Sequence, residues 1–300
     1  MTSILNAFVN VSKEFAMIVV TGATGQLGRL VIESLLQSVP PSSIVAVVRD
    51  TAKAAGFAAR GVQVRQADYS QPASLDGAFA GAGKLLLISS NELGQRVAQH
   101  RAVIEAAARS GVKLVAYTSL LHADTSPLGL ALEHRVTEAL LQASGLPHVL
   151  LRNGWYTENY TAGAAAALQH GVLLGGAGEG RISSAARGDY AAAAAAVLIQ
   201  EGQAGRVYEL AGDSAYTLAE LAAEIARQSG KPVTYRDLAK ADYAAALLGL
   251  GLPAPIAELL SDSDLGASRG GLFDESYQLS RLIGRATTPL AQTVSAALQA

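Results

Sequence analysis

The chain has 300 residues, half of them hydrophobic and only 16% charged, so an intrinsically disordered protein is excluded and a sizeable core is possible. A formal net charge of −2 gives no reason to expect nucleic acid or an anionic membrane as a partner. Cysteine is absent, which excludes disulfides and thiolate catalysis and fits a reducing compartment such as the cytoplasm. No apolar run reaches the roughly 20 residues that span a bilayer.

Residues 1–16 differ from the rest of the chain. Their only charges are Lys13 and Glu14, and they lack the basic start and long apolar core of a signal peptide. We therefore expect a loosely ordered extension, with the folded chain beginning at Met17.

The next segment predicts a strand, a tight turn and the start of a helix. Ile18-Val-Val leads into three glycines, Gly22, Gly25 and Gly28, and an apolar helical pattern follows from Leu30. Such glycines permit a sharp turn, a close approach of the backbone to a ligand, and tight packing of the helix on the strand. The helix N-terminus offers free amides to a pyrophosphate. Spaced glycines alone often form only a turn, but the flanking strand and helix favour a dinucleotide site.

Up to residue 152, short apolar runs alternate with helical ones. Five further strands are predicted, and helices fill the intervals between them; the strands are 44–48, 62–66, 84–89, 112–118 and 148–152. This alternation predicts an α/β fold, a Rossmann-like doubly wound parallel sheet. We assign it to residues 17–152 as the NADP-binding domain.

From residue 153 the pattern changes, and we expect a smaller α+β lobe over 153–300, partly interleaved with the first domain. Two short strands, 171–175 and 181–183, are predicted to form a hairpin around the glycine-rich turn 175–180. Asp189 is expected to cap an alanine-rich helix, and residues 264–273 to form a flexible loop, of which 266–273 is a candidate lid.

Shorter strand and helix patterns complete this half of the chain. Residues 207–210 and 233–235 predict strands, and Thr217 with Glu220 forms a capping box for a helix that ends at Gly230. Helices are predicted at 240–248 and 255–260, and a last one from Thr288-Pro289.

The residue that ends the second strand bears on the choice of dinucleotide. An NAD-specific site commonly has an acidic residue there, whereas this chain has Arg49, whose guanidinium matches a 2′-phosphate in charge and geometry. We therefore expect NADPH, with Lys53 as a second cation. A solvated arginine beside a helix cap is the alternative, and Asp50 leaves NADH open as the less favoured cofactor.

Polar residues also end the third and fourth strands. Asp68 is placed either to touch the adenine edge or to cap a helix. Ser89, Ser90 and Asn91 follow the fourth strand, beside the expected nicotinamide ribose.

The proton-donating pattern Tyr-x-x-x-Lys is missing from the helix after the fifth strand, which reads Glu133-His134-Arg-Val-Thr. Reduction of an ordinary ketone benefits from a positioned acid, whereas an electron-poor acceptor such as a quinone takes hydride with less help. His134 is retained as a candidate catalytic side chain. The five histidines show no metal-ligand spacing, so no metal is expected.

Several segments together resemble the NmrA-like atypical short-chain dehydrogenases. They are Gly22-Ala-Thr-Gly25-Gln-Leu-Gly28, Val48-Arg49, residues 85–90, residues 117–129 and Arg152-Asn-Gly-Trp-Tyr156. The resemblance covers Met17 to the C-terminus, and the last two segments are much more specific than the glycine motif. The chain is most similar to the bacterial quinone reductases of this family, with the triphenylmethane-dye reductases as near relatives.

The resemblance implies roles for particular residues. It implies that Gly22, Ala23, Thr24, Gly25, Gln26 and Leu27 surround the pyrophosphate, and that Arg49 meets the 2′-phosphate. The rest of the cofactor would be lined by Ser89, Ser90, Asn91, Asn153, Gly154, Trp155, Tyr156, Thr157 and Glu158. From the residues alone, the segment after the sixth strand either pins a domain crossover or forms a wall of the nicotinamide pocket. By analogy, Asn159 is a substrate-side amide.

We therefore expect an oxidoreductase that passes hydride from NADPH to a quinone-type acceptor, without flavin or metal. Two alternatives remain: an NADP(H)-binding redox-sensing regulator without catalysis, and a reductase of triphenylmethane dyes or another activated acceptor. Both a monomer and a homodimer are compatible with the sequence.

Overall fold

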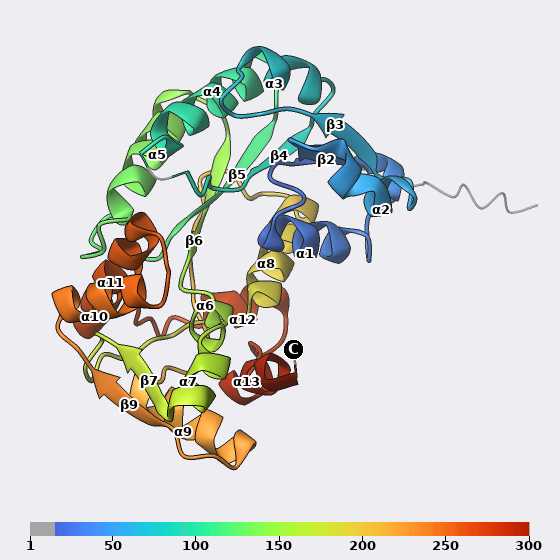
Figure 1. Ribbon diagram of the computed structural model, residues 1–300. Coiled ribbons are helices and arrows are strands. Elements are labelled where there is room, and N and C mark those ends of the chain that lie inside the picture. The colour runs from blue at the N-terminus through green and yellow to red at the C-terminus, as the bar shows by residue number, and fades with distance from the viewer. Residues whose placement is uncertain (1–15, 93, 300) are drawn as a thin grey trace, which may run out of the picture.

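A computed structural model describes residues 16–92 and 94–299 of the chain. Its centre is a seven-stranded parallel sheet with the strand order β3-β2-β1-β4-β5-β6-β8 (Figure 1). The strands are β1 (Ile18–Val20), β2 (Ile44–Val48), β3 (Gln63–Gln66), β4 (Lys84–Leu87), β5 (Leu114–Leu120), β6 (His148–Asn153) and β8 (Val207–Leu210). The predicted Rossmann-like sheet is confirmed, and β8 extends it beside β6 as a seventh strand. The expected extension, residues 1–16, lies almost wholly outside the described residues.

Both faces of the sheet are covered, which explains the continuous apolar runs of its strands. Val20 and Leu86 face the helices α1 (Gln26–Leu35), α8 (Arg187–Ile199) and α12 (Gln278–Ile283). Their neighbours Val19 and Leu85 face the opposite layer, α3 (Ala73–Ala78), α4 (Arg96–Arg109) and α5 (Ala131–Ala143). Two short helical segments, η2 (Thr51–Ala54) and α2 (Ala55–Ala58), follow β2, and η1 (Pro41–Ser43) precedes it.

The second lobe lies beyond the carboxyl ends of the strands and has its own core. It contains α6 (Thr157–Thr161), α7 (Ala164–His170), β7 (Val172–Gly175), α9 (Leu218–Ser229), β9 (Thr234–Asp237), α10 (Lys240–Gly249), α11 (Ala254–Ser268) and α13 (Leu290–Gln299). The predicted capping box is confirmed: Thr217 Oγ1 accepts from the Glu220 amide at 3.2 Å, and Glu220 Oε2 accepts from the Thr217 amide at 2.7 Å. Although they follow residue 152, α8, β8 and α12 belong to the layer of the large sheet.

The predicted hairpin around the glycine-rich turn is wrong. Strand β7 pairs in parallel with β9, while Ile182 makes only an isolated bridge with Tyr216. The amides of the turn are taken by other side chains: Gly176 donates to Asp264 Oδ2 at 2.8 Å and Gly178 donates to Asp237 Oδ1 at 2.9 Å. The turn amides therefore bind the carboxylates of Asp264 and Asp237, which both lie well beyond the turn in the sequence.

Two further predictions in this half of the chain are corrected. Asp189 is not the cap of α8, which begins at Arg187; its buried carboxylate accepts from the Thr288 amide at 2.7 Å. Residues 264–268 belong to α11, not to a flexible loop. A Cβ on Gly266 would lie 2.8 Å from the side chain of Leu128, so this glycine permits close packing. Of the candidate lid 266–273, only residues 269–273 lie outside this helix.

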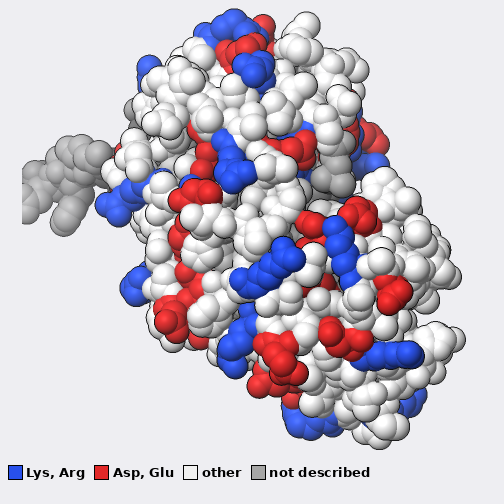
Figure 2. Space-filling model, turned by 90° about the vertical axis from the view of Figure 1, so that its left-hand side faces the viewer, with Lys and Arg blue, Asp and Glu red and all other residues white. Residues whose placement is uncertain are grey.

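The surface seen from the side of α10 and α11 mixes both signs of charge (Figure 2). Lysines and arginines lie among acidic residues on this face and form no extended cationic field. Among the described residues, no helix combines the length and hydrophobicity needed to cross a membrane.

Candidate functional site

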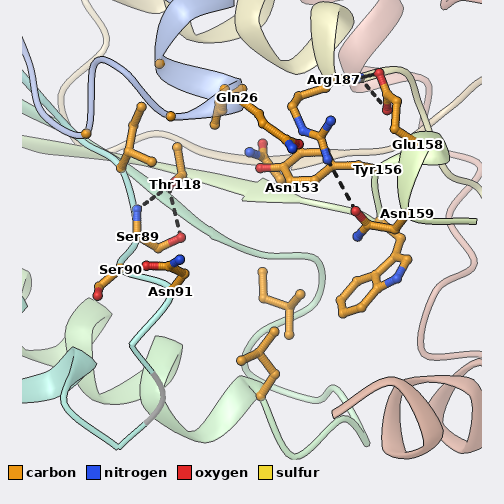
Figure 3. Close-up of a pocket in the computed structure, with 18 of the residues that line it drawn as sticks. Gln26, Ser89, Ser90, Asn91, Thr118, Asn153, Tyr156, Glu158, Asn159 and Arg187 are labelled. Carbon is orange, nitrogen blue, oxygen red and sulfur yellow. Dashed lines mark hydrogen bonds between the residues drawn. The ribbon is translucent and has the colours of Figure 1, made fainter. Parts of the chain in front are cut away.

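A cavity of about 1360 Å³ lies between the carboxyl ends of the strands and the second lobe. Pockets for a single drug-sized molecule have volumes of about 300–1,000 Å³, so this cavity is larger than one such molecule needs. Figure 3 shows residues of its central part. They come from the segment after β4, from β5 and β6, and from α1, α6 and α8, with Gln26 of α1 beside Tyr156 and Arg187. This is the edge of a doubly wound sheet at which ligands bind.

The glycine turn forms one end of this cavity. Gly22 has a φ of +59°, and a Cβ on Gly28 would lie 2.3 Å from the Gly22 carbonyl oxygen and 2.8 Å from Ala23 Cα. Gly25 precedes α1, and no side chain caps this helix. Gln26 and Leu27, at its start, line the cavity. The turn therefore leaves helix N-terminal amides free for an anion.

Arg49 lies at the outer rim of the same end. Its side chain is 66% exposed and pairs with Glu92 Oε1 at 2.9 Å. An exposed pair of this kind contributes only about 0–1 kcal/mol, so a phosphate can displace Glu92 at little cost. Lys53 is not among the lining residues. Asp68 lines the cavity and does not cap α3, whose N-cap is Pro72; its carboxylate accepts from the Ser70 amide at 2.8 Å in a local turn.

The segment after β4 is held by side chains of neighbouring elements. The Ser89 amide donates to Thr118 Oγ1 at 2.8 Å, and the Ser90 amide donates to His100 Nε2 at 2.9 Å. Burial, together with the charge of Arg96, lowers the pKa of His100 to about 3, so this imidazole is neutral and accepts that bond. Ser89, Ser90 and Asn91 all line the cavity in a fixed conformation.

His134 lines the cavity but is already engaged by protein groups. Its Nδ1 lies 2.7 Å from Tyr117 Oη, its Nε2 lies 3.5 Å from Arg96 Nη1, and the residue is only 4% exposed. Burial and the charge of Arg96 lower its pKa well below the usual value. A neutral imidazole with Arg96 against its Nε2 carries its proton on Nδ1 and donates it to Tyr117. At neutral pH it therefore has no proton to give to a ligand.

The segment after β6 both walls the cavity and crosses between the lobes. Asn153, Gly154, Trp155 and Tyr156 line the cavity, and the buried Asn153 Oδ1 has no hydrogen-bond partner in the described part of the chain. The Gly154 amide donates to Leu210 O at 2.7 Å, which ties this wall to β8. The two interpretations left open by the sequence are therefore both compatible with its structure.

Two of the expected cofactor residues do not line the cavity. Ala23 is buried beneath the glycine turn, and Thr157 turns its hydroxyl toward Ser184 Oγ, 2.8 Å away. Apart from Lys53, all other residues expected at the site from the sequence line this cavity.

Sequence reasoning missed Arg187, which is central to the site. Its guanidinium lies over the ring of Tyr156, 4.7 Å from the centroid, and Nη2 donates to Asn159 Oδ1 at 3.3 Å (Figure 3). Both Glu158 oxygens accept from the Arg187 backbone amide, at 2.9 and 3.0 Å. Within the described residues no carboxylate pairs with its guanidinium. The only sequence signal at this position is the start of an alanine-rich helix.

The far end of the cavity is apolar and also escaped prediction. Most of its lining is small or aliphatic and comes from α7, α11 and α13 and from the segments before α5 and after α6: Leu130, Ala162, Ala165, Leu259, Leu260, Ala296 and Ala297. Thr161, Gln292 and Thr293 add polar groups to it. Such a surface suits a flat hydrophobic molecule. No group of side chains that could hold a metal ion was found among the described residues.

Comparison with known proteins agrees with this geometry. Residues 22–201 match the family model described as NAD(P)H-binding. The chain is 63% identical over 279 residues to quinone oxidoreductase 2 of Escherichia coli K12, covering 93% of this chain and 98% of that protein.

Two solved structures are similar over almost the whole chain. The E. coli NADPH-dependent quinone oxidoreductase complexed with NADPH has a TM-score of 0.92 and 62% identity, covering 94% of this chain and 100% of that one. The Citrobacter triphenylmethane reductase complexed with NADP(H) has a TM-score of 0.90 and 40% identity, covering 93% and 99%. The chain belongs to the NAD(P)H-binding, NmrA-like family.

Proposed function

We propose that this protein is an NADPH-dependent reductase that passes hydride to a quinone-type acceptor. The observation that carries the proposal is the single cavity that runs from the glycine turn and Arg49 past Asn159 and Arg187 to an apolar end. The 63% identity to a quinone oxidoreductase supports the acceptor class. We place the enzyme in the cytoplasm; a monomer and a homodimer are equally compatible with the proposal.

The cofactor half of the cavity fits a dinucleotide phosphate. The uncapped start of α1 would hold the pyrophosphate, and Arg49 would exchange Glu92 for the 2′-phosphate. The unpartnered Asn153 Oδ1 is an acceptor for an amide N–H of the nicotinamide side. When bound, NADPH supplies a hydride, and the proposal includes no flavin or metal because hydride can pass directly between a nicotinamide and a quinone.

We assign the polar contact with the acceptor to Asn159 and Arg187. Hydride addition to a quinone places a negative charge on the second oxygen, and a guanidinium without a carboxylate partner stabilises that oxyanion. A proton from water then completes the hydroquinone. His134 acts as a positioning residue, because it is neutral and bonded to Tyr117.

The test is the oxidation of NADPH and of NADH in the presence of benzoquinone and naphthoquinone acceptors. We expect turnover with both acceptors and a preference for NADPH. Tight NADPH binding with no turnover of any quinone would contradict the proposal. A parallel series of triphenylmethane dyes tests the second candidate activity, which the 40% identical Citrobacter enzyme favours.

A further inference from the structure

One surface segment of the second lobe is apolar without interruption. Residues 244–257, which join α10 to α11, read Ala-Ala-Ala-Leu-Leu-Gly-Leu-Gly-Leu-Pro-Ala-Pro-Ile-Ala and contain no charged or hydrogen-bonding side chain. Within it, Leu248 is 49% exposed, Leu250 56% and Ile256 40%. Exposed large hydrophobic side chains clustered in this way mark a binding surface more often than isolated ones do.

This apolar tip is held in place by polar contacts at its base. Lys240 pairs with Glu258 at 2.7 Å and with Asp262 at 3.0 Å, and Asp262 also accepts from the Gly129 amide at 2.8 Å. Helices α10 and α11 pack together as a helical hairpin, in which Leu247 and Ala257 are buried. The leucines of the tip are therefore exposed by a fixed packing of the two helices against the body of the protein.

The same surface continues into the cavity. Ile256, Leu259 and Leu260 are spaced i, i+3 and i+4, so they share one face of α11. Leu259 and Leu260 line the apolar end of the cavity, one helical turn from the exposed Ile256. A hydrocarbon chain that leaves the cavity along this face would meet aliphatic side chains from Leu260 to the hairpin tip.

We propose that the hairpin binds the hydrocarbon side chain of the acceptor, so that the preferred substrates are quinones carrying an alkyl or prenyl chain. The inference rests on the proposed function. An anionic bilayer is a poorer occupant, because residues 241–268 contain no lysine or arginine and carry Asp242, Glu258, Asp262 and Asp264. The continuity with the cavity favours a ligand over a second protein chain.

The experiment measures kcat/KM for 1,4-benzoquinones bearing straight alkyl chains of zero to ten carbons. Full burial of a methylene contributes about 0.8 kcal/mol, or about fourfold. Because an exposed surface buries only part of each methylene, we expect kcat/KM to rise about twofold per carbon over the first members, mainly through KM. A flat series in the wild-type protein would overturn the inference.

The variant that tests the surface is the triple change Leu248→Ser, Leu250→Ser and Ile256→Ser. We expect it to flatten the chain-length series and to leave kcat/KM for unsubstituted benzoquinone within twofold of the wild type. The matched control replaces two exposed aliphatic residues elsewhere, Leu30→Ser and Val207→Ser, and should keep the wild-type series. If the triple variant keeps the wild-type dependence of kcat/KM on chain length, the inference is contradicted. This holds even if sedimentation shows that the three substitutions convert a dimer to a monomer, since the surface would then be a dimer interface.

Binding can be followed without turnover. Trp155, the only tryptophan, lines the cavity, so quenching of its fluorescence reports quinone binding directly. We expect the Kd for a decyl-substituted quinone to rise at least tenfold in the triple variant, and an unchanged Kd would overturn the inference. Loss of turnover with intact, chain-dependent binding would instead contradict the proposed function alone.

Discussion

The two ends of the cavity are built in different ways. At the cofactor end, the lining residues lie just after strands. Arg49 is the first residue after β2, and Ser89 is the second after β4. At the acceptor end, the wall is assembled from α7, α11 and α13, and contacts there join distant segments, such as Gly129 with Asp262, 133 residues apart. The lining of the cofactor end can therefore be predicted from local sequence, whereas the residues of the acceptor end come together only in the folded chain.

The largest effect is expected at the glycine turn. In Gly28→Ala, the new Cβ would lie 2.3 Å from a backbone oxygen, so the turn and α1 must separate. We expect at least a hundredfold loss of NADPH affinity by calorimetry, or a loss of about 3 kcal/mol in unfolding free energy, as for other overpacked sites. The control is Gly77→Ala in α3, where nothing lies within 4 Å and no loss is expected. Equal affinities of the two variants would contradict the assigned role.

The second largest effect is expected at Arg187, which lies between the cofactor end and the acceptor end of the cavity. Arg187→Gln removes the positive charge beside Asn159, and a lost hydrogen bond to a charged group costs about 1.5–3 kcal/mol. We therefore expect kcat with benzoquinone to fall about 10–100-fold while the Kd for NADPH changes less than threefold. Arg187→Lys should recover part of the loss. If instead the Kd for NADPH rises and kcat is kept, Arg187 belongs to the cofactor end.

Two buried groups outside the cavity lining, Asp264 and His100, should make stability depend on pH in opposite directions. Burial raises the pKa of Asp264 to about 6, although its bond from the Gly176 amide opposes this. The folded protein thus holds a proton that the unfolded chain releases near pH 4, and stability falls as pH rises from about 4 to 6. His100, whose pKa is lowered to about 3, acts in the opposite direction: its contribution to the unfolding free energy increases as pH rises above that value.

Asp264→Asn isolates this contribution. It removes the titration while an amide oxygen still accepts from Gly176. The unfolding free energy of the variant minus that of the wild type should therefore be about 2 kcal/mol higher at pH 7 than at pH 4. Urea titrations of both proteins at pH 4 and pH 7 measure the difference. Identical pH profiles of variant and wild type would show that Asp264 is already ionised at pH 4 in the fold.

The smallest effect concerns the choice of cofactor. Arg49→Glu reverses a charge at an exposed rim, and we expect about a tenfold loss of NADPH affinity with little change for NADH, in line with the modest strength of exposed charge pairs. Competition binding with both nucleotides measures the ratio. Equal losses would mean that Arg49 does not contact the 2′-phosphate.

These contrasts explain how much of the molecule could be predicted. The strands and the capping box at Thr217 follow from local patterns, because neighbouring residues alone determine them. The prediction of a β-hairpin was wrong because β7 pairs with β9, about 60 residues further along the chain. Arg187 could not be found because its contacts to Asn159 and Tyr156 exist only after α8 returns to the sheet.

The path of the chain between the lobes has a consequence for motion. After entering the second lobe at α6, the chain returns to the sheet with α8 and β8, leaves again for α9, and returns once more with α12 before α13. Asp189 fastens α8 to the segment before α13 through the Thr288 amide. Domain closure uses a few hinge residues that absorb the backbone rotation, and no single hinge can serve so many crossings. Closure of the lobes would therefore need coordinated backbone rotation at each of these crossings, and not at one hinge.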